Sequence, residues 1–410
     1  MAKSQKHIVL ITTWFPPTNG VAVNRMVGFA KYLDKSKFDV TVLTKSETGE
    51  KQITDLFDCA VTRIPNHQLL KSPKFNTKDS ALKHKLKVVW NIVLLKLKSD
   101  IYNNWRKEVV KELNSLNKQK KIDAIISSFS PEAAHLAAHE FCVVHKEIFW
   151  VADMRDEMSQ NPTISKSVKN KYLKIEKLID DRANLVTSVS APICDLFRNT
   201  TMHNVADIIE IRNGFDHDLV ANKNLPNNIF TIGYAGTFYG EHKPDKFFMA
   251  INLLIGRKEF PENFEIHFVG SSKNFTVPGS LKKHVRFIHR VTHNESQLMM
   301  QQFDANLLMI SKSSRVGVYS GKLFEYIAAQ RPIIAIVDKN DVAAKLIKEL
   351  NAGFIASESD INEIQHAILN CYQSWKNKKQ FQVDLEEVKK LHRKFQVDKL
   401  NLILDKELND

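Results

Sequence analysis

The stretch ANLLMISKSSRVGVYSGKLFEYIAAQRPIIAIV, residues 305–337, decides the fold of this chain. It opens on a continuous apolar run, crosses a polar turn and enters a helical pattern that ends before Pro332. A second apolar run follows at residues 332–337. Continuous apolar runs are typical of parallel strands buried on both faces, and a helix between two of them connects neighbouring parallel strands. The stretch therefore predicts an α/β fold.

The same alternation of strand and helix extends outward through the whole chain. Short apolar runs predict strands in both halves, at residues 8–11, 40–43, 124–126, 148–151, 185–189 and 208–211, and again at residues 230–236, 264–270, 284–289, 305–310, 332–337 and 352–356. Helical patterns lie between most of them, as in residues 23–33, where apolar positions recur every three or four residues. This alternation predicts two Rossmann-like domains, each a doubly wound parallel sheet, that face a cleft.

The length of the chain agrees with two domains, because 410 residues exceed what one hydrophobic core usually serves. We assign residues 1–211 to an N-terminal domain and residues 230–385 to a C-terminal domain. The turn-rich residues 212–229 are the linker. The last segment, residues 386–410, is helical and amphipathic, and we expect it to return to the N-terminal domain.

The composition places the chain among ordinary globular proteins, with 43% hydrophobic and 26% charged residues. The four cysteines are scattered without a CxxC pair, which favours a reducing compartment and argues against a disulfide framework or a zinc site. The N-terminus enters a strand-like run within a few residues and lacks the apolar core of a signal peptide. These features predict a cytoplasmic protein.

The net charge of +13 is concentrated in one segment, residues 71–121, which has fourteen Lys and Arg against four Asp and Glu. Apolar residues at helical spacing alternate with the lysines, and the longest uncharged run, Val88 to Leu95, is too short to span a bilayer. A nucleic-acid binder could carry such a segment, but the mixture suits an anionic membrane surface at least as well. We expect a basic amphipathic insertion that contacts the inner membrane, and no nucleic acid. A basic helix packed on its domain is the plain alternative.

Several familiar motifs fail on inspection. The turn after the first strand lacks GxGxxG, so a dinucleotide site there is not indicated. GVYSGKL, residues 317–323, has the wrong glycine spacing for a phosphate-binding P-loop and no Ser or Thr after its lysine. Asp216-His217-Asp218 follows an Asn-Gly turn and is interpreted as a solvated linker. No histidine spacing indicates a metal site, so none is predicted.

The turn before the helix of residues 321–330 carries the strongest site signal. Ser320 is placed to cap this helix, whose free N–H groups and dipole attract phosphate. Lys322 lies in the first turn, where a cation opposes the dipole unless an anion is bound. Glu325 lies one turn further on, and a carboxylate can accept two hydrogen bonds from a ribose diol. The combination indicates a nucleotide-sugar diphosphate site; a capped surface helix with ordinary charges is the alternative.

Residues 320–336 resemble the donor-site motif of glycosyltransferase family 4 and its relatives, which often read SKLFEYLA-x-x-KPI. The resemblance continues along nearly the whole chain, at residues 15–33, 126–138, 151–159, 211–216, 232–239 and 296–310. Only the SGKLFEY block is specific by itself, but the order of the motifs is informative. The resemblance implies the GT-B fold and a bacterial-type glycosyltransferase. It also implies that Gly20 lets backbone approach the sugar or the phosphate, and that Gly236 and Gly321 belong to the donor-binding residues.

Two positions depart from the pattern of the family. Gly317 stands where relatives with an E-x7-E signature carry a glutamate aimed at the sugar. Thr237 stands where many relatives carry an arginine after the first strand of the C-terminal domain. The charge of the leaving group must then be neutralised by other cations, of which Lys322 is the first choice, followed by Arg315 and Lys243.

The resemblance implies a retaining transfer that needs no metal ion and no cofactor beyond the nucleotide-sugar donor. Lys322, Arg155 and Asp156 are the candidate catalytic residues. Arg155 falls where several relatives keep a histidine near the sugar, and we assign it and Asp156 to orienting the acceptor or the sugar. An Arg–Asp pair that only fixes a loop is an equally good interpretation.

These observations predict transfer of a sugar from a nucleotide-diphosphate donor to a cell-envelope polysaccharide or a lipid-linked glycan. We expect the enzyme to be peripheral on the cytoplasmic face of the membrane. Two rival functions stay open. A nucleotide-sugar 2-epimerase would share the fold and the phosphate site, whereas a non-enzymatic membrane or nucleic-acid-binding protein would explain only the charge.

Overall fold

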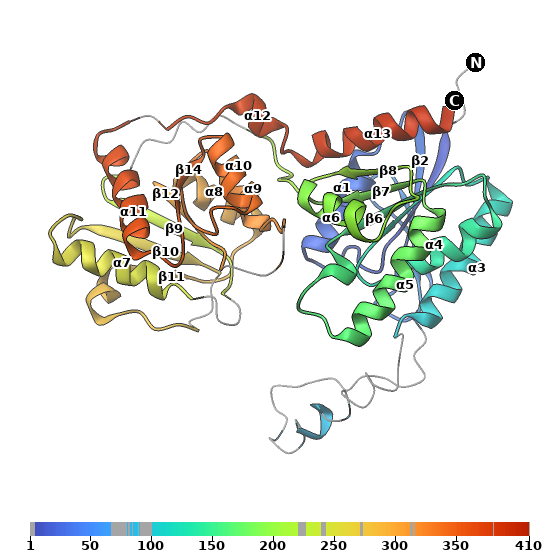
Figure 1. The fold of residues 1–410 in the computed structure, drawn as a ribbon, viewed down its shortest axis with the longest axis horizontal. Coiled ribbons are helices and arrows are strands. Elements are labelled where there is room, and N and C mark those ends of the chain that lie inside the picture. Colours follow the sequence, from blue (N-terminus) through green and yellow to red (C-terminus); the bar gives the residue numbers. More distant parts are fainter. Residues whose placement is uncertain are drawn as a thin grey trace. The chain divides into compact units, whose positions relative to one another are not determined.

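The computed structural model describes residues 5–66, 80, 83, 85–88, 90, 101–219, 227–238, 243–270, 274–311, 315, 317–379 and 381–409. The chain divides into two compact α/β units (Figure 1). The first comprises Met1–Ser188, Cys194–Glu210 and Val397–Asp410, and the second comprises Val189–Ile193 and Ile211–Gln396. The chain passes from the first unit into the second between Glu210 and Ile211, one residue before the expected boundary.

The first unit is built on an eight-stranded sheet in the order β3-β4-β2-β1-β5-β6-β7-β8. Its strands are β1 (Lys6–Ile11), β2 (Phe38–Lys45), β3 (Gln52–Asp55), β4 (Ala60–Ile64), β5 (Ala124–Ser128), β6 (Phe149–Arg155), β7 (Leu185–Ser188) and β8 (Asp207–Glu210). All neighbours are parallel except β3 and β4. The six predicted strands of this half are confirmed, and β3 and β4 are additional. β3 is exposed at every position, so it lacks the apolar run that the prediction relied on.

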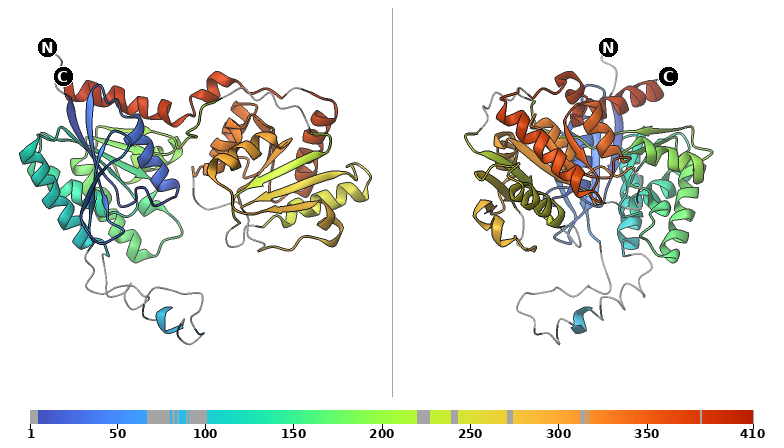
Figure 2. Two further views of the ribbon diagram at one scale, coloured as in Figure 1. Left: turned by 180° about the vertical axis from the view of Figure 1, so that it is seen from behind. Right: turned by 60° about the vertical axis from the view of Figure 1, so that its left-hand side comes forward.

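Helices cover both faces of this sheet (Figure 2). They are α1 (Val21–Tyr32), α3 (Asn103–Gln119), α4 (Ala133–Val144), α5 (Lys166–Arg182) and α6 (Ala191–Thr200), with a short 3-10 helix at Met158–Gln160. α4 packs between α3 and α5. The C-terminal helix α13 (Arg393–Asn409) completes the unit from Val397 onward. Its Asn401 donates a hydrogen bond of 3.0 Å to the carbonyl oxygen of Tyr32 at the end of α1.

The structure divides the basic segment of residues 71–121 into two parts. Its second part contains α3, in which Trp105, Val109 and Leu113 form a fully buried stripe against the domain. The plain alternative is therefore correct for α3, because a stripe repeating every four residues is occupied by the protein's own core. In the first part, Leu86, Val88 and Trp90 are 62%, 38% and 47% exposed. Leu94, Leu95, Lys96 and Lys98 lie outside the described residues.

Asn66 and Ile101, described residues on either side of the first part of the segment, are in contact. Asn66, just beyond β4, donates a hydrogen bond of 3.1 Å from its side-chain nitrogen to the carbonyl oxygen of Ile101. Within the described ranges, none of the helices has both the length and the apolar character needed to cross a bilayer.

The second unit contains a six-stranded parallel sheet in the order β11-β10-β9-β12-β13-β14. Its strands are β9 (Phe230–Ala235), β10 (Phe264–Val269), β11 (Val285–Ile288), β12 (Ala305–Met309), β13 (Ile333–Ile336) and β14 (Gly353–Ala356). All six were predicted. The helices are α7 (Asp245–Gly256), α8 (His293–Gln302), α9 (Gly321–Ala328), α10 (Val342–Glu349), α11 (Ile361–Lys376) and α12 (Leu385–Lys389), and a 3-10 helix spans Gly279–His284.

Each face of this second sheet has its own hydrophobic core. On one face α7 and α11 bury residues such as Phe247 and Ile364 against the strands. On the other face α8, α9 and α10 bury residues such as Met300, Leu323 and Ala343. Two cores on opposite faces are the property of a doubly wound sheet, so this part of the fold prediction is confirmed. The arrangement fixes α9 rigidly against the sheet, with its first turn at the carboxyl edge of the strands.

Candidate functional site

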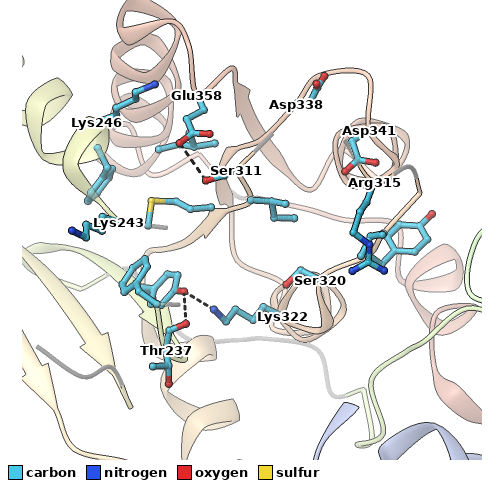
Figure 3. Close-up of a pocket in the computed structure, with 18 of the residues that line it drawn as sticks. Thr237, Lys243, Lys246, Ser311, Arg315, Ser320, Lys322, Asp338, Asp341 and Glu358 are labelled. Carbon is cyan, nitrogen blue, oxygen red and sulfur yellow. Dashed lines mark hydrogen bonds between the residues drawn. The ribbon is translucent and has the colours of Figure 1, made fainter. Parts of the chain in front are cut away.

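A cavity of about 460 Å³ lies at the carboxyl edge of the second sheet (Figure 3). The chain runs from β9 to β10 on one side and later returns to pair β12 with the other side of β9. Ligands of doubly wound sheets bind at such a reversal of strand order. The cavity is lined from the segments after β9, β12, β13 and β14, by Tyr234, Thr237, Phe238, Lys243, Lys246, Phe247, Met309, Ile310, Ser311, Arg315, Val318, Tyr319, Ser320, Lys322, Ile336, Asp338, Asn340, Asp341 and Glu358.

The first turn of α9 faces this cavity. Ser320 is the N-cap residue, as predicted, with extended backbone angles, but its hydroxyl makes no capping hydrogen bond to the helix. Leu323, Phe324, Tyr326 and Ile327 are buried and fix the helix from the opposite side. Because the Ser320 hydroxyl does not bond the backbone N–H groups of the first turn, these groups can bind an anion instead.

Lys322 extends from this turn into the cavity, where it meets a tyrosine of β9. Its Nζ donates a hydrogen bond of 2.5 Å to the hydroxyl oxygen of Tyr234, drawn as a dashed line in Figure 3, and lies 4.2 Å from the centroid of the same ring. Burial lowers the pKa of Lys322 to about 8. In the part of the chain that the structure describes, no carboxylate forms an ion pair with this lysine. An anion entering the cavity would supply the missing negative charge.

Gly236 provides the space that Lys322 occupies. A Cβ atom on Gly236 would lie 2.5 Å from Cε and 2.9 Å from Nζ of Lys322. The φ angle of Gly236 is +121°, which L side chains rarely adopt. This residue was predicted to belong to the donor-binding site. The structure gives it a second use, since a side chain here would displace the lysine.

Charges of both signs surround the rest of the cavity. Lys243 and Arg315, both predicted, line it together with Lys246, whereas Asp338, Asp341 and Glu358 stand on the side formed after β13 and β14. The Ser311 hydroxyl donates a hydrogen bond of 3.3 Å to Glu358. Asp341 also caps α10 by accepting a hydrogen bond of 2.8 Å from the backbone N–H of Val342, and burial raises its pKa. The cavity can therefore bind a dianion on one side and a hydroxyl-rich group on the other.

Glu325 does not line the cavity but lies in a polar cluster beside it. Its carboxylate is 3.5 Å from Nδ1 of His217 and 3.8 Å from Nε2 of His293. The side-chain nitrogen of Gln297 lies 3.3 Å from Glu325 and 2.7 Å from His217. The interpretation of residues 216–218 as solvated linker is wrong for His217, whose side chain is only 19% exposed, and for Asp216, which lies 3.7 Å from Arg393, whereas Asp218 is exposed. Burial lowers the pKa of His217.

Gly321, also predicted, is the first residue of α9 and does not itself line the cavity. The other predicted residues, Gly20, Arg155 and Asp156, belong to the first unit and do not line the cavity. Gly20 precedes α1 as its N-cap residue. Arg155 ends β6 with a φ of +59°, and its Nη1 donates a hydrogen bond of 2.9 Å to the carbonyl oxygen of Phe129. Asp156 lies 3.9 Å from the Arg155 guanidinium. These contacts match the interpretation of an Arg–Asp pair that fixes a loop, and they leave the Asp156 carboxylate one-third exposed.

Asp153, three residues before Asp156, is structural. It is completely buried and accepts hydrogen bonds of 3.0 and 2.6 Å from the Arg25 guanidinium of α1. The hydroxyls of Ser128 and Thr187 donate to the same carboxylate at 2.7 Å each. Burial alone would raise the pKa of Asp153, but the guanidinium and the two hydroxyls hold it below its ordinary value. Neither group is accessible to a substrate, so the pair ties α1 to β6.

Sequence reasoning missed Tyr234, Lys246, Ser311, Asp338, Asp341 and Glu358. For Ser311, Asp338 and Glu358 a signal existed, because each lies within two residues of the end of a predicted strand, and such positions gather at the carboxyl edge of a parallel sheet. Tyr234 gave no such signal, since a tyrosine within an apolar strand is predicted to be part of the hydrophobic core. Over the described residues, no three His, Cys, Asp or Glu side chains are grouped so that they could hold a metal ion.

Comparison with protein families finds one match. Residues 229–374, which lie within the second unit, match the family model described as glycosyl transferases group 1. The match contains the cavity, α9 and the strands on both sides of it. No curated protein sequence matches the chain significantly.

Solved structures match over nearly the full length. The sucrose-phosphate synthase of Thermosynechococcus elongatus superimposes with a TM-score of 0.65 at 14% identity, covering 98% of this chain and 100% of its own. An E. coli trehalose-6-phosphate structure bound with UDP-2-fluoro glucose gives 0.59 at 12% identity, covering 98% and 99%. A lipopolysaccharide outer core galactosyltransferase in its apo form gives 0.58 at 11% identity, covering 98% and 99%. At these identities the similarity concerns the fold.

Proposed function

We propose that the chain is a glycosyltransferase that uses a nucleotide-diphosphate sugar as donor, because residues 229–374 match the model of group 1 glycosyltransferases and the two α/β units have the GT-B fold. The acceptor we propose is a cell-envelope polysaccharide or a lipid-linked glycan. The observation that carries the donor assignment is the cavity at the strand reversal. There the start of α9 and the half-buried Lys322 lie together, and among the described residues no carboxylate pairs with this lysine. The E. coli structure bound with UDP-2-fluoro glucose shows a donor of this class on a related fold.

In this proposal the diphosphate binds between the first turn of α9 and the cations of the cavity. Lys322 contacts the phosphate that leaves, with Arg315 and Lys243 as further cations. Negative charge grows on the leaving diphosphate as the glycosidic bond breaks, so a fixed ammonium and fixed N–H donors stabilise the transition state more than the ground state. Protein cations at these positions can carry out the charge neutralisation, and we propose a transfer that requires no metal ion.

The sugar and the acceptor complete the reaction. We propose that the configuration of the sugar is retained and that the departing phosphate oxygen takes the proton of the attacking hydroxyl. The carboxylates Asp338 and Glu358 and the Ser311 hydroxyl offer hydrogen bonds to a polyhydroxylated sugar. Arg155 and Asp156 are assigned to orienting the acceptor or the sugar. The φ of +59° at Arg155 supports a functional assignment, because non-glycine residues in this conformation cluster at active sites.

Glu325 is assigned to the ribose of the donor. Its carboxylate lies one turn along α9 from Lys322, and its side chain is 17% exposed. His217, His293 and Gln297 surround it within 3.3–3.8 Å. A carboxylate has about four acceptor sites, so it can still accept two hydrogen bonds from a vicinal diol.

A membrane-bound acceptor is supported by the first part of the basic segment. Residues 71–100 contain eight lysines and two aspartates, and the described Leu86 and Trp90 expose apolar surface among them. Lysines and exposed apolar side chains together bind the headgroup region of anionic membranes. We therefore propose that the enzyme is cytoplasmic and peripheral on the inner membrane through residues 71–100. The lipopolysaccharide galactosyltransferase supports an envelope acceptor only by similarity of fold.

The proposed function is tested with a panel of UDP-, GDP- and dTDP-sugars. Binding is measured by calorimetry, and release of free nucleotide diphosphate is then followed with membranes as the source of acceptor. We expect one donor to bind and to be consumed only when membranes are present. Conversion of the sugar to its 2-epimer without membranes would instead identify an epimerase and contradict the proposal.

A matched pair of lysine variants makes the test specific for the cavity. Lys322→Ala should lower turnover more than donor binding, because its charge is needed most as the diphosphate departs. Lys348→Ala removes an exposed lysine near the end of α10 and should change neither. Normal turnover in Lys322→Ala, with only the melting temperature changed, would remove the lysine from the mechanism.

A further inference from the structure

We propose that Tyr234 is a positioning residue that holds the Lys322 ammonium inside the cavity, where the diphosphate of the donor binds. The assignment rests on the proposed function for the identity of the ligand. Its basis is the geometry of two side chains that meet across the strand reversal, one from the end of β9 and one from the first turn of α9.

Lys322 needs such a partner in order to point into the cavity. A lysine in the first turn of a helix is repelled by the positive end of the helix dipole, and its four-carbon stem has many rotamers. Tyr234 opposes both effects. Its hydroxyl oxygen accepts a hydrogen bond of 2.5 Å from Nζ, and its ring face lies 4.2 Å from the same atom. Both contacts favour the charged form of the lysine.

Tyr234 is itself fixed in one orientation. Its ring is 3% exposed and stacks on Phe238 with a centroid distance of 4.1 Å. Its hydroxyl donates to the carbonyl oxygen of Thr237 at 3.4 Å, while the same oxygen accepts the hydrogen bond from Lys322. An ammonium has three N–H donors, and the contact with Tyr234 uses one. Two donors therefore remain for phosphate oxygens without breaking the contact.

The other charged groups of the cavity do not replace this contact. The carboxylates Asp338, Asp341 and Glu358 and the cations Lys243, Lys246 and Arg315 line the same space. Burial is the one cause that lowers the pKa of Lys322, to about 8. Because burial works against the charged form, the hydrogen bond and the ring contact with Tyr234 are the contacts that favour it when the donor arrives.

The test combines a titration of Lys322 with a double-mutant cycle. Protein labelled with carbon-13 at the lysine ε position is titrated by NMR, and the Lys322 signal is assigned from its absence in Lys322→Arg. Tyr234→Phe keeps the ring and removes the hydroxyl, so it should shift the midpoint of Lys322 to lower pH. It should also weaken the binding of the best ligand among UDP, GDP, ADP and dTDP, about tenfold, as expected for a hydrogen bond to a charged group.

The cycle separates positioning from a general structural effect. If Tyr234 acts through Lys322, then Tyr234→Phe should have no effect on diphosphate binding in the Lys322→Ala background. Tyr372→Phe is the matched control, since Tyr372 packs against Phe230 and Trp375 and does not line the cavity.

Two results would overturn the assignment: an unchanged Lys322 midpoint in Tyr234→Phe, or an equal loss of affinity in both backgrounds. If the midpoint shifts and diphosphate binding follows the cycle while no sugar is transferred, the assignment of Tyr234 stands and the proposed function fails.

Discussion

Replacing Gly236 by alanine tests the arrangement of the cavity most directly. The added Cβ would lie 2.5 Å from Cε and 2.9 Å from Nζ of Lys322, so the lysine has to leave its position. It then loses the hydrogen bond to Tyr234 and its place beside the phosphate site. A hydrogen bond to a charged group contributes about 1.5–3 kcal/mol, so diphosphate affinity should fall roughly 10- to 150-fold.

The same substitution also strains the backbone, and the assay must separate the two effects. An alanine at a φ of +121° costs about 1–3 kcal/mol of folding free energy. Thermal unfolding therefore measures the strain, while calorimetric titration with the best-binding nucleoside diphosphate measures the displacement of the lysine. Gly256→Ala is the matched control, because a Cβ at the end of α7 meets no atom within 4 Å. It should leave the affinity unchanged.

The double variant provides the result that would refute this reasoning. In the Lys322→Ala background there is no lysine to displace, so Gly236→Ala should cause no further loss of affinity. A further loss of similar size would show that Gly236 acts through its backbone alone. Unchanged affinity of a folded Gly236→Ala protein would show that the position of Lys322 does not depend on this space.

Four further predictions follow from the structure. Diphosphate affinity should fall as pH rises above about 8, because Lys322 then loses its charge, and Lys322→Arg should move this fall to higher pH. Glu325→Ala should weaken donor binding by about 2–3 kcal/mol, and an unchanged dissociation constant would exclude it from the ribose site. Burial lowers the pKa of His135 to about 4, so the unfolded state binds more protons between pH 4 and 6.5. The free energy of unfolding should therefore decrease as pH falls through that window, less steeply in His135→Gln. Anionic liposomes should bind the protein at low salt. Binding to liposomes should be abolished, with diphosphate affinity unchanged, when glutamine replaces five lysines: Lys83, Lys85, Lys87, Lys96 and Lys98.

The strands of both units could be predicted because burial on both faces leaves a strong local signature. All twelve predicted runs are strands, whereas β3, exposed throughout, escaped. The start of α9 was also readable, since Ser320 and the following apolar stripe are local features. Lys243, Arg315, Ser320 and Lys322 were named from sequence, and all four line the cavity.

Contacts between residues that are distant in the sequence could not be predicted from the sequence alone. Lys322 and Tyr234 are 88 positions apart and meet only because β9 and α9 border the same strand reversal. His217 looked like part of a solvated turn, yet tertiary packing places it against Glu325. The apolar stripe of α3 could have packed against a membrane or against the protein's own core, because the spacing of apolar residues along a helix is the same in both cases. By itself the sequence determined which segments are strands and helices, because that depends on local pattern. Only the tertiary structure decided which side chains share a cavity, since that depends on the order in which the strands pair.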